Sequence, residues 1–309
     1  MNPKYLFVAL LLAASANGRA SAQVEIDKQQ PAPARGEVHV ENEFGSIEIT
    51  GWDRDVVRVT GTLAAGAEGI ELDSDEEGAS IDVSIPEAWL YASDSDTEFR
   101  STLIVQVPQG SSVYVETLNA TVTVRGVRGH VEIETVNGPV TLEGDPASVE
   151  ISSMTGNVQV RARAAEMEVE SISGAVDLAG AVRRARVQTT SAAIDIRGES
   201  LEEVEVESVT GDVTVDGSFT AKGGVDIETH SGKVELRLPA SVRAKFECET
   251  FSGKIDNAFG PQPVPEKRFH PQKELRFSTG PDSFTIQVQT FSGDIVLGKR
   301  SGGSAERKT

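Results

Sequence analysis

The sequence predicts an all-β protein, a parallel β-solenoid of about ten repeats of 18–21 residues with an irregular N-terminal β cap. Three observations support this fold class. The chain is only 5% aromatic, has 29 Gly and is rich in Val, Ile and Thr, which favours strands over helices. One short motif recurs along most of the chain. Within each copy, apolar and polar residues alternate with the period of two that is typical of strands.

The chain begins with the features of a secretory signal peptide, which we assign to residues 1–22. Lys4 precedes an apolar run from Leu6 to Ala14, and Ala20-Ser21-Ala22 forms a cleavage site of the Ala-x-Ala type. The protein is therefore expected to be exported, and to be periplasmic or secreted. No later run reaches the roughly 18 apolar residues that a membrane helix needs, so no transmembrane segment is expected.

Residues 23–112 are predicted to form an N-terminal β region that includes the first repeat copy. Strands are expected at 56–60, 81–85 and 103–107, interrupted by the acidic loop Asp73-Ser-Asp-Glu-Glu77 and by Ser93-Asp-Ser-Asp96. This region is expected to cap the stack of repeats.

The regular repeat stack is assigned to residues 113–257 and is best seen in Val131–Leu142. Counting from Val131, positions 1, 3, 10 and 12 are apolar, position 5 carries a hydroxyl, position 7 is polar and position 8 is Gly. The same frame recurs around Ala120, Gly156, Gly174, Ala192, Gly211, Gly232 and Gly253, and outlying copies surround Gly45 and Gly293. From Ala120 to Gly253, successive position-8 residues are 18, 18, 18, 18, 19, 21 and 21 residues apart.

Two architectures satisfy this pattern. A parallel solenoid places equivalent residues about 4.8 Å apart in successive coils, whereas a string of hairpins with Gly turns also brings positions 3 and 12 to one face. The solenoid is favoured because the 18-residue period persists through very different connectors, such as 143–146 and 161–164. The hydroxyls at position 5 are expected to hydrogen-bond along the stack at a corner.

The end of the chain departs from the regular spacing. Residues 258–283 are predicted to be a Pro-rich loop, residues 284–298 the last repeat, and residues 299–309 a flexible polar tail.

Several phrases resemble the bacterial β-strand-repeat family labelled "putative adhesin". They are Leu103-Ile-Val-Gln-Val-Pro108, Leu236-Arg-Leu-Pro239, Phe246–Asn257 and the closing Gln289–Leu297. The resemblance covers about residues 36–298. It implies a β-solenoid in the bacterial envelope, and the family offers no catalytic motif that could be transferred to this chain.

Composition excludes several functions. The formal charge is −19, and loss of Lys4 and Arg19 with the signal peptide gives −21, which disfavours nucleic-acid binding. Cys248 is the single cysteine, so it can form no disulfide within the chain and is expected to be a buried apolar residue. The four His residues show no metal-ligand spacing, and we find no convincing nucleophile or phosphate-loop motif.

Acidic residues repeat at positions 2 and 4, which point outward from the same strand. The face that they form is interrupted by Arg186 at one coil. Like charges about 5 Å apart repel by roughly 0.8 kcal/mol in water, so Ca²⁺ is a candidate ligand of this face; the alternative is an ordinary solvated face that opposes aggregation. The candidate metal residues are Glu132, Glu134, Glu150, Glu168, Glu170, Glu205, Glu207, Asp226 and Glu228.

The sequence predicts a non-catalytic protein, adhesin-like, that binds or scaffolds an unidentified envelope polymer or protein. No catalytic or cofactor-binding residue is assigned. One alternative is a structural protein that self-assembles into filaments. Another is a glycan-active β-helix enzyme, for which Asp73, Asp75, Glu76 and Glu77 would be the candidate acids.

Overall fold

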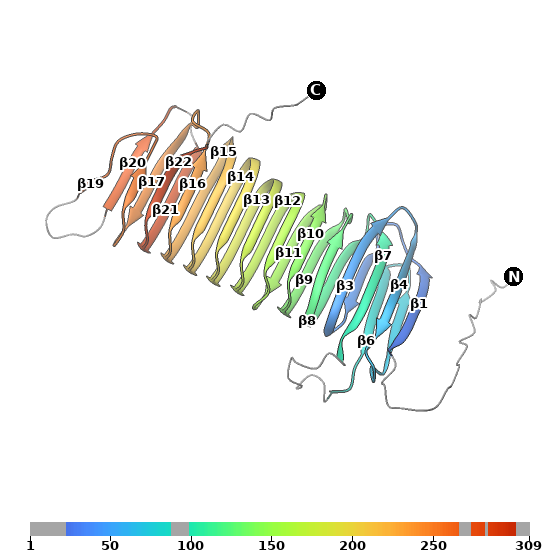
Figure 1. Ribbon diagram of the computed structural model, residues 1–309. Helices are drawn as coiled ribbons and strands as arrows, with labels where there is room; N and C mark the ends of the chain where they lie inside the picture. The colour runs from blue at the N-terminus through green and yellow to red at the C-terminus, as the bar shows by residue number, and fades with distance from the viewer. Residues whose placement is uncertain (1–22, 88–98, 266–272, 282–283, 301–309) are drawn as a thin grey trace, which may run out of the picture.

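The computed structural model describes residues 23–87, 99–265, 273–281 and 284–300. These residues form 22 β-strands that are linked by hydrogen bonds into one elongated stack (Figure 1). The predicted signal peptide and residues 301–309 of the predicted tail lie outside the described residues. The all-β prediction is confirmed.

The strands fall into three groups along the chain. The N-terminal group is β1 (Val24–Pro31), β2 (Glu37–Glu41), β3 (Phe44–Trp52), β4 (Val56–Leu63), β5 (Gly69–Ser74), β6 (Gly78–Ser84) and β7 (Ser101–Pro108). The central group is β8 (Ser112–Arg125), β9 (His130–Asn137), β10 (Val140–Gly144), β11 (Ser148–Ser153), β12 (Val158–Ser173), β13 (Val176–Ser191), β14 (Ile194–Thr210), β15 (Val213–Ser231) and β16 (Val234–Leu238). The C-terminal group is β17 (Ala244–Thr250), β18 (Ile255–Asn257), β19 (Val264–Pro265), β20 (Lys273–Ser278), β21 (Phe284–Ser292) and β22 (Ile295–Lys299).

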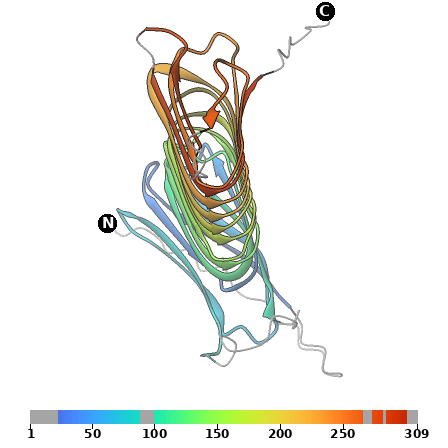
Figure 2. The same cartoon turned by 90° about the vertical axis from the view of Figure 1, so that its left-hand side faces the viewer.

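Each coil contributes one strand to each of two facing sheets. In the first sheet, Val131 pairs with Val113 on one side and with Val149 on the other, and all three strands are parallel. In the second sheet, Val140 pairs in the same way with Val122 and Val158. Pairing between equivalent residues of successive coils confirms the solenoid and rules out a string of hairpins. Seen from the β20 end, the coils appear as narrow nested loops (Figure 2).

The core lies between the two sheets and is built from repeat positions 1, 3, 10 and 12. In the coil that begins at Val131, the side chains of Val131, Ile133, Val140 and Leu142 are at most 1% exposed. Each such burial contributes about 1.5–3 kcal/mol, and stacking supplies the partners that a single coil lacks. Gly138, at position 8, has φ +128°, and a Cβ there would overlap the main-chain oxygen of Ala120 in the preceding coil.

The last repeat in the chain is not the last coil of the stack. β21 pairs in parallel with both β15 and β17, and β22 lies in the same way between β16 and β18. The final copy is therefore inserted between the two copies that precede it. The insertion is possible because the three copies share one register: Ile295 pairs with Val234 on one side and with Ile255 on the other.

At the N-terminal end, too, the order of the strands in the stack differs from their order in the chain. β2 lies between β6 and β8, and β3 lies between β7 and β8, although β6 and β7 follow them in the chain. Beyond this outer coil, β5 pairs antiparallel with β6, and β4 pairs antiparallel with both β7 and β1. These antiparallel strands form the N-terminal end of the molecule.

The prediction of a Pro-rich loop over residues 258–283 is wrong in part. β20 pairs antiparallel with β17, and the short β19 pairs with β20. Residues 273–278 contain no Pro and alternate in polarity, so Leu275 is 4% exposed and Phe277 stacks on Phe246 with 4.6 Å between ring centroids. This segment covers the outer edge of β17.

Candidate functional site

A groove runs along one corner of the stack, where the first-sheet strand of each coil ends. It has a volume of about 1120 Å³ and extends from Glu43 to Phe251, crossing ten coils. Its lining comes from repeat positions 4, 5 and 6. Because positions 4 and 6 point outward while position 5 points into the corner, the same three positions of every coil build two walls and a floor. We call this feature the corner groove.

One wall is acidic and consists of the position-4 residues, here called the acidic row. In stacking order the row is Glu116, Glu134, Ser152, Glu170, Gln188, Glu207, Glu228, Gln289 and Glu249. Among the described residues, Glu116, Glu134, Glu170 and Glu228 make no ion pair with a basic side chain, and Glu207 accepts a hydrogen bond from Gln188. Four predicted residues, Glu134, Glu170, Glu207 and Glu228, thus lie in the groove.

The opposite wall is formed by position 6, here called the apolar row. The wall begins with the charged residue Glu43, and the apolar row that follows is, in stacking order, Leu118, Val136, Met154, Ile172, Thr190, Val209, His230, Phe291 and Phe251. Met154, Ile172, Val209, Phe291 and Phe251 are 43–51% exposed. Sequence reasoning missed this row, although the same repeat frame reveals it one residue beyond the hydroxyl.

An aromatic stack ends the apolar row. The ring centroid of Phe291 lies 4.9 Å from that of His230 and 5.0 Å from that of Phe251, with interplanar angles of 5° and 7°. The stack depends on the inserted C-terminal copy, since Phe291 lies on β21 between β15 and β17. Flat aromatic faces on a surface are suited to apolar or cationic ligand groups.

The floor is the row of position-5 hydroxyls. The expected bonding along the stack is seen between Thr189 and Ser208, whose hydroxyls are 3.0 Å apart. Elsewhere the hydroxyls donate to main-chain carbonyls at the corner, as Thr250 Oγ1 does to Gly293 at 3.0 Å. Ser171 Oγ and Thr290 Oγ1 have no hydrogen-bond partner among the described residues, although both residues are about 95% buried.

The remaining predicted residues form a second acidic row at position 2, outside the groove on the same sheet. This outer row contains Glu132, Glu150, Glu168, Glu205 and Asp226, with Arg186 between Glu168 and Glu205. Arg186 Nη2 lies 2.6 Å from Glu205 Oε2.

Crowding of like charges raises carboxyl pKa values on this sheet. The pKa of Glu150 is raised by burial and then by Glu132 and Glu168 on either side. The pKa of Asp226 is raised by burial and then by Glu228 and Glu205. Each ionised carboxylate on this face therefore makes the ionisation of its neighbours less favourable.

The second sheet has the opposite electrostatics. Arg197 Nε lies 2.8 Å from Asp195 Oδ1, and Arg197 Nη2 lies 3.0 Å from Asp177 Oδ1. The pKa of Glu235 is lowered by hydrogen bonds from Lys233 and Arg237. Acidic side chains on the second sheet are therefore neutralised by basic neighbours, whereas negative charge accumulates on the first sheet.

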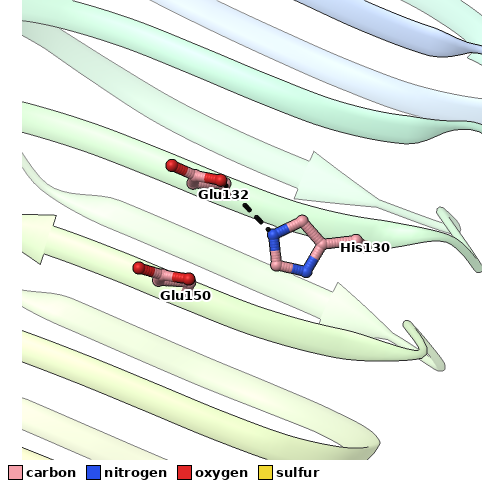
Figure 3. Close-up of side chains that lie close together, drawn as sticks. All are labelled: His130, Glu132 and Glu150. Atoms are coloured by element: carbon pink, nitrogen blue, oxygen red, sulfur yellow. Dashed lines mark hydrogen bonds and ion pairs between the residues drawn. The ribbon is translucent and has the colours of Figure 1, made fainter.

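One cluster could hold a metal ion. His130, Glu132 and Glu150 place ligand atoms within 4.8 Å of one another (Figure 3). His130 Nε2 lies 3.4 Å from Glu132 Oε2, and His130 Nδ1 lies 2.8 Å from Ser148 Oγ, so the histidine already has partners on both sides. An imidazole among the donors suits a transition metal better than Ca²⁺, which takes oxygen ligands. The predicted binding of Ca²⁺ to the acidic face stays a prediction.

The residues considered for catalysis have structural roles where contacts are seen. Asp75 Oδ1 accepts hydrogen bonds from the main-chain N–H groups of Glu77 and Gly78, which closes the turn between β5 and β6. Burial raises the pKa of the Cys248 thiol to about 12, which keeps it protonated and unreactive.

Comparison with known proteins identifies the family. A profile of the Toastrack DUF4097 family matches residues 37–297, which include every coil of the stack. The chain belongs to this family. This match confirms the resemblance to a β-strand-repeat family, and the coils of this Toastrack chain are the repeats recognised in its sequence.

Solved structures similar to this Toastrack chain include two bacterial proteins described as putative adhesins. The one from Bacteroides fragilis is 12% identical, with 90% of this chain and 98% of that chain covered and a TM-score of 0.47. The one from Parabacteroides merdae is also 12% identical, with 88% and 95% covered and a TM-score of 0.45. No curated protein matches significantly. Among the described residues, no helix has the length and apolarity needed to span a membrane.

Proposed function

We propose that this Toastrack protein is exported and non-catalytic, and that it binds or scaffolds cell-envelope components in an adhesin-like manner through the corner groove. The observation that carries the proposal is the continuity of the groove over ten coils, with one largely acidic row and one largely apolar row. A long groove of constant composition suits an extended polymeric or fibrous partner better than a small substrate. The groove offers no acid–base pair or nucleophile with an activating partner among the described residues.

The structure gives less support to self-assembly into filaments. That alternative needs an uncovered terminal coil that could pair with the next molecule. Instead, β17 is covered by β20 at one end, and β7 is covered by β4 at the other. Both covering strands run antiparallel to the coils, so they do not present the coil register to a second molecule.

Co-sedimentation tests the proposal. Purified residues 23–309 are mixed with isolated cell-wall and outer-membrane fractions over a salt series, with and without Ca²⁺. We expect saturable pelleting with one fraction, and we expect the variant Met154→Thr/Ile172→Thr/Val209→Thr to pellet less, because it replaces exposed apolar groove residues with the residue that Thr190 already provides. Absence of pelleting at every salt concentration, with large assemblies in the supernatant, would instead favour self-assembly.

A further inference from the structure

We propose that the corner groove binds a cationic amphipathic polypeptide segment, which lies along the stack with its basic side chains on the acidic row and its apolar side chains on the apolar row. This inference rests on the proposed binding function and specifies the class of partner. It follows from the charge, the exposed apolar surface, the spacing and the unused hydrogen-bonding groups of the groove.

The charge of the groove calls for a positive partner. The acidic row has no basic side chain, and Glu116, Glu134, Glu170 and Glu228 have no ion pair among the described residues. The neutral members Ser152, Gln188 and Gln289 separate the carboxylates only in part. A basic ligand would relieve repulsion that the protein does not relieve itself, whereas nucleic acid, an anionic membrane or a second copy of this acidic chain would add to it.

The apolar row calls for a partner that also has an apolar side. Met154, Ile172 and Val209 are each about half exposed and lie on the same corner of the stack, and the aromatic stack continues the row. A contiguous exposed apolar surface with a charged rim is characteristic of protein interaction sites. A purely cationic polymer or a free metal ion would leave this row in water.

The spacing of the rows suits a polypeptide helix. Successive coils are about 4.8 Å apart, and an α-helix advances about 5.4 Å per turn. A helix lying along the groove would thus present nearly one turn to each coil. Its Lys or Arg side chains could cover the position-5 floor with their apolar stems while reaching the acidic row.

The floor also has hydrogen-bonding capacity that the chain does not use. Ser171 and Thr290 line the groove and are about 95% buried, yet their hydroxyl oxygens have no partner among the described residues. Buried hydroxyls without partners are uncommon in folded proteins. Each of these oxygens exposes less than 1 Å² to solvent, so an occupant would hydrogen-bond to it only after the side chain turns toward the groove.

Fluorescence anisotropy with three labelled peptides of equal length tests the inference. The first has Lys and Leu arranged as two stripes on a helix, the second has the same composition in scrambled order, and the third has Glu in place of Lys. We expect the full mature chain to bind the first peptide at least about tenfold more tightly than the second, and not to bind the third.

Matched variants locate the site. Glu134→Gln/Glu170→Gln/Glu207→Gln removes three groove carboxylates and introduces the residue that Gln188 already provides at this position. Glu132→Gln/Glu150→Gln/Glu168→Gln removes the same charge from the outer row of the same sheet. We expect the groove variant to weaken binding of the first peptide about tenfold, and the outer-row variant to weaken it less than about threefold.

Equal weakening by the two variants would overturn the inference, because it would show attraction to net charge alone. Binding of the scrambled peptide as tightly as the striped one, or binding of a neutral oligosaccharide and of no peptide, would also overturn it. The last result would leave the proposed envelope-binding function intact, as would envelope pelleting without peptide binding. Failure of both assays would reject the two proposals together.

Discussion

At the scale of single residues, the outer acidic row is a site where neutral residues should stabilise the protein. Glu150 lies between Glu132 and Glu168, and its pKa is raised by burial and then by these two carboxylates. We expect Glu150→Gln to raise the melting temperature by about 1–3 °C, because it removes two repulsive pairs that each cost less than about 1 kcal/mol. The matched control is Asp195→Asn on the other sheet, which loses an ion pair with Arg197 and should bring no gain. A gain in both variants would contradict this account.

Burial and, after it, the neighbouring carboxylates make stability depend on pH. In Glu41, Glu43, Glu150 and Asp226, the folded-state pKa lies above the ordinary value, so the folded chain takes up these protons before the unfolded chain does. Their contribution to the free energy of unfolding must therefore rise as the pH falls from neutral toward 4.5, the ordinary value for glutamate. Calorimetry should show a melting temperature that rises over this range and a smaller rise at high salt.

Glycine is required at the position-8 sites where a Cβ would overlap the main chain of the preceding coil. Gly211 has φ +135°, and a Cβ there would overlap the carbonyl oxygen of Ala192. We expect Gly211→Ala to destabilise the protein by about 3 kcal/mol or more, measured by denaturant unfolding. Gly69 has open space where its Cβ would lie, so Gly69→Ala should be nearly neutral and serves as the control.

At the scale of elements, the inserted C-terminal copy should stabilise the coil outside it. In the part of the chain that the structure describes, β21 and β22 are the strands that pair β17 and β18 with the rest of the stack. We expect a chain that ends at residue 283 to lose amide protection throughout 244–257, although those residues are still present. A chain that ends at Arg300 keeps β22 and should retain this protection in hydrogen-exchange measurements.

The elements also show what the sequence could and could not predict. Period-two alternation and equal spacing determine the strands of the regular coils, because position 1 of every copy must be buried against its neighbours. Stacking order was not predictable, since the copies around Gly232, Gly253 and Gly293 have interchangeable registers. The carboxylates of the acidic row were found because charge is conspicuous, whereas the apolar row looked like ordinary repeat variation until it was seen at an exposed corner.

At the scale of the whole molecule, the regular middle should accept additional coils. Residues 149–166 make up one full period, and both ends of the stack lie outside them. We expect a variant with a second copy of 149–166 to fold with a similar melting temperature, since each added coil makes the same contacts as its neighbours. Duplicating only 149–157 should prevent folding, because half a period places first-sheet residues against the second sheet.

The inserted C-terminal copy also bears on the timing of folding. A chain that is synthesised from its N-terminus presents residues 244–257 before residues 284–299. Ile255 and Ile295 have the same register relative to Val234 of β16. The earlier coil can therefore stack directly on residues 225–236 before β21 and β22 are available. That premature arrangement must open before β21 and β22 can enter. If this temporary pairing forms, we expect the last step of folding to be its replacement by β21 and β22, at a rate that depends on how quickly it separates.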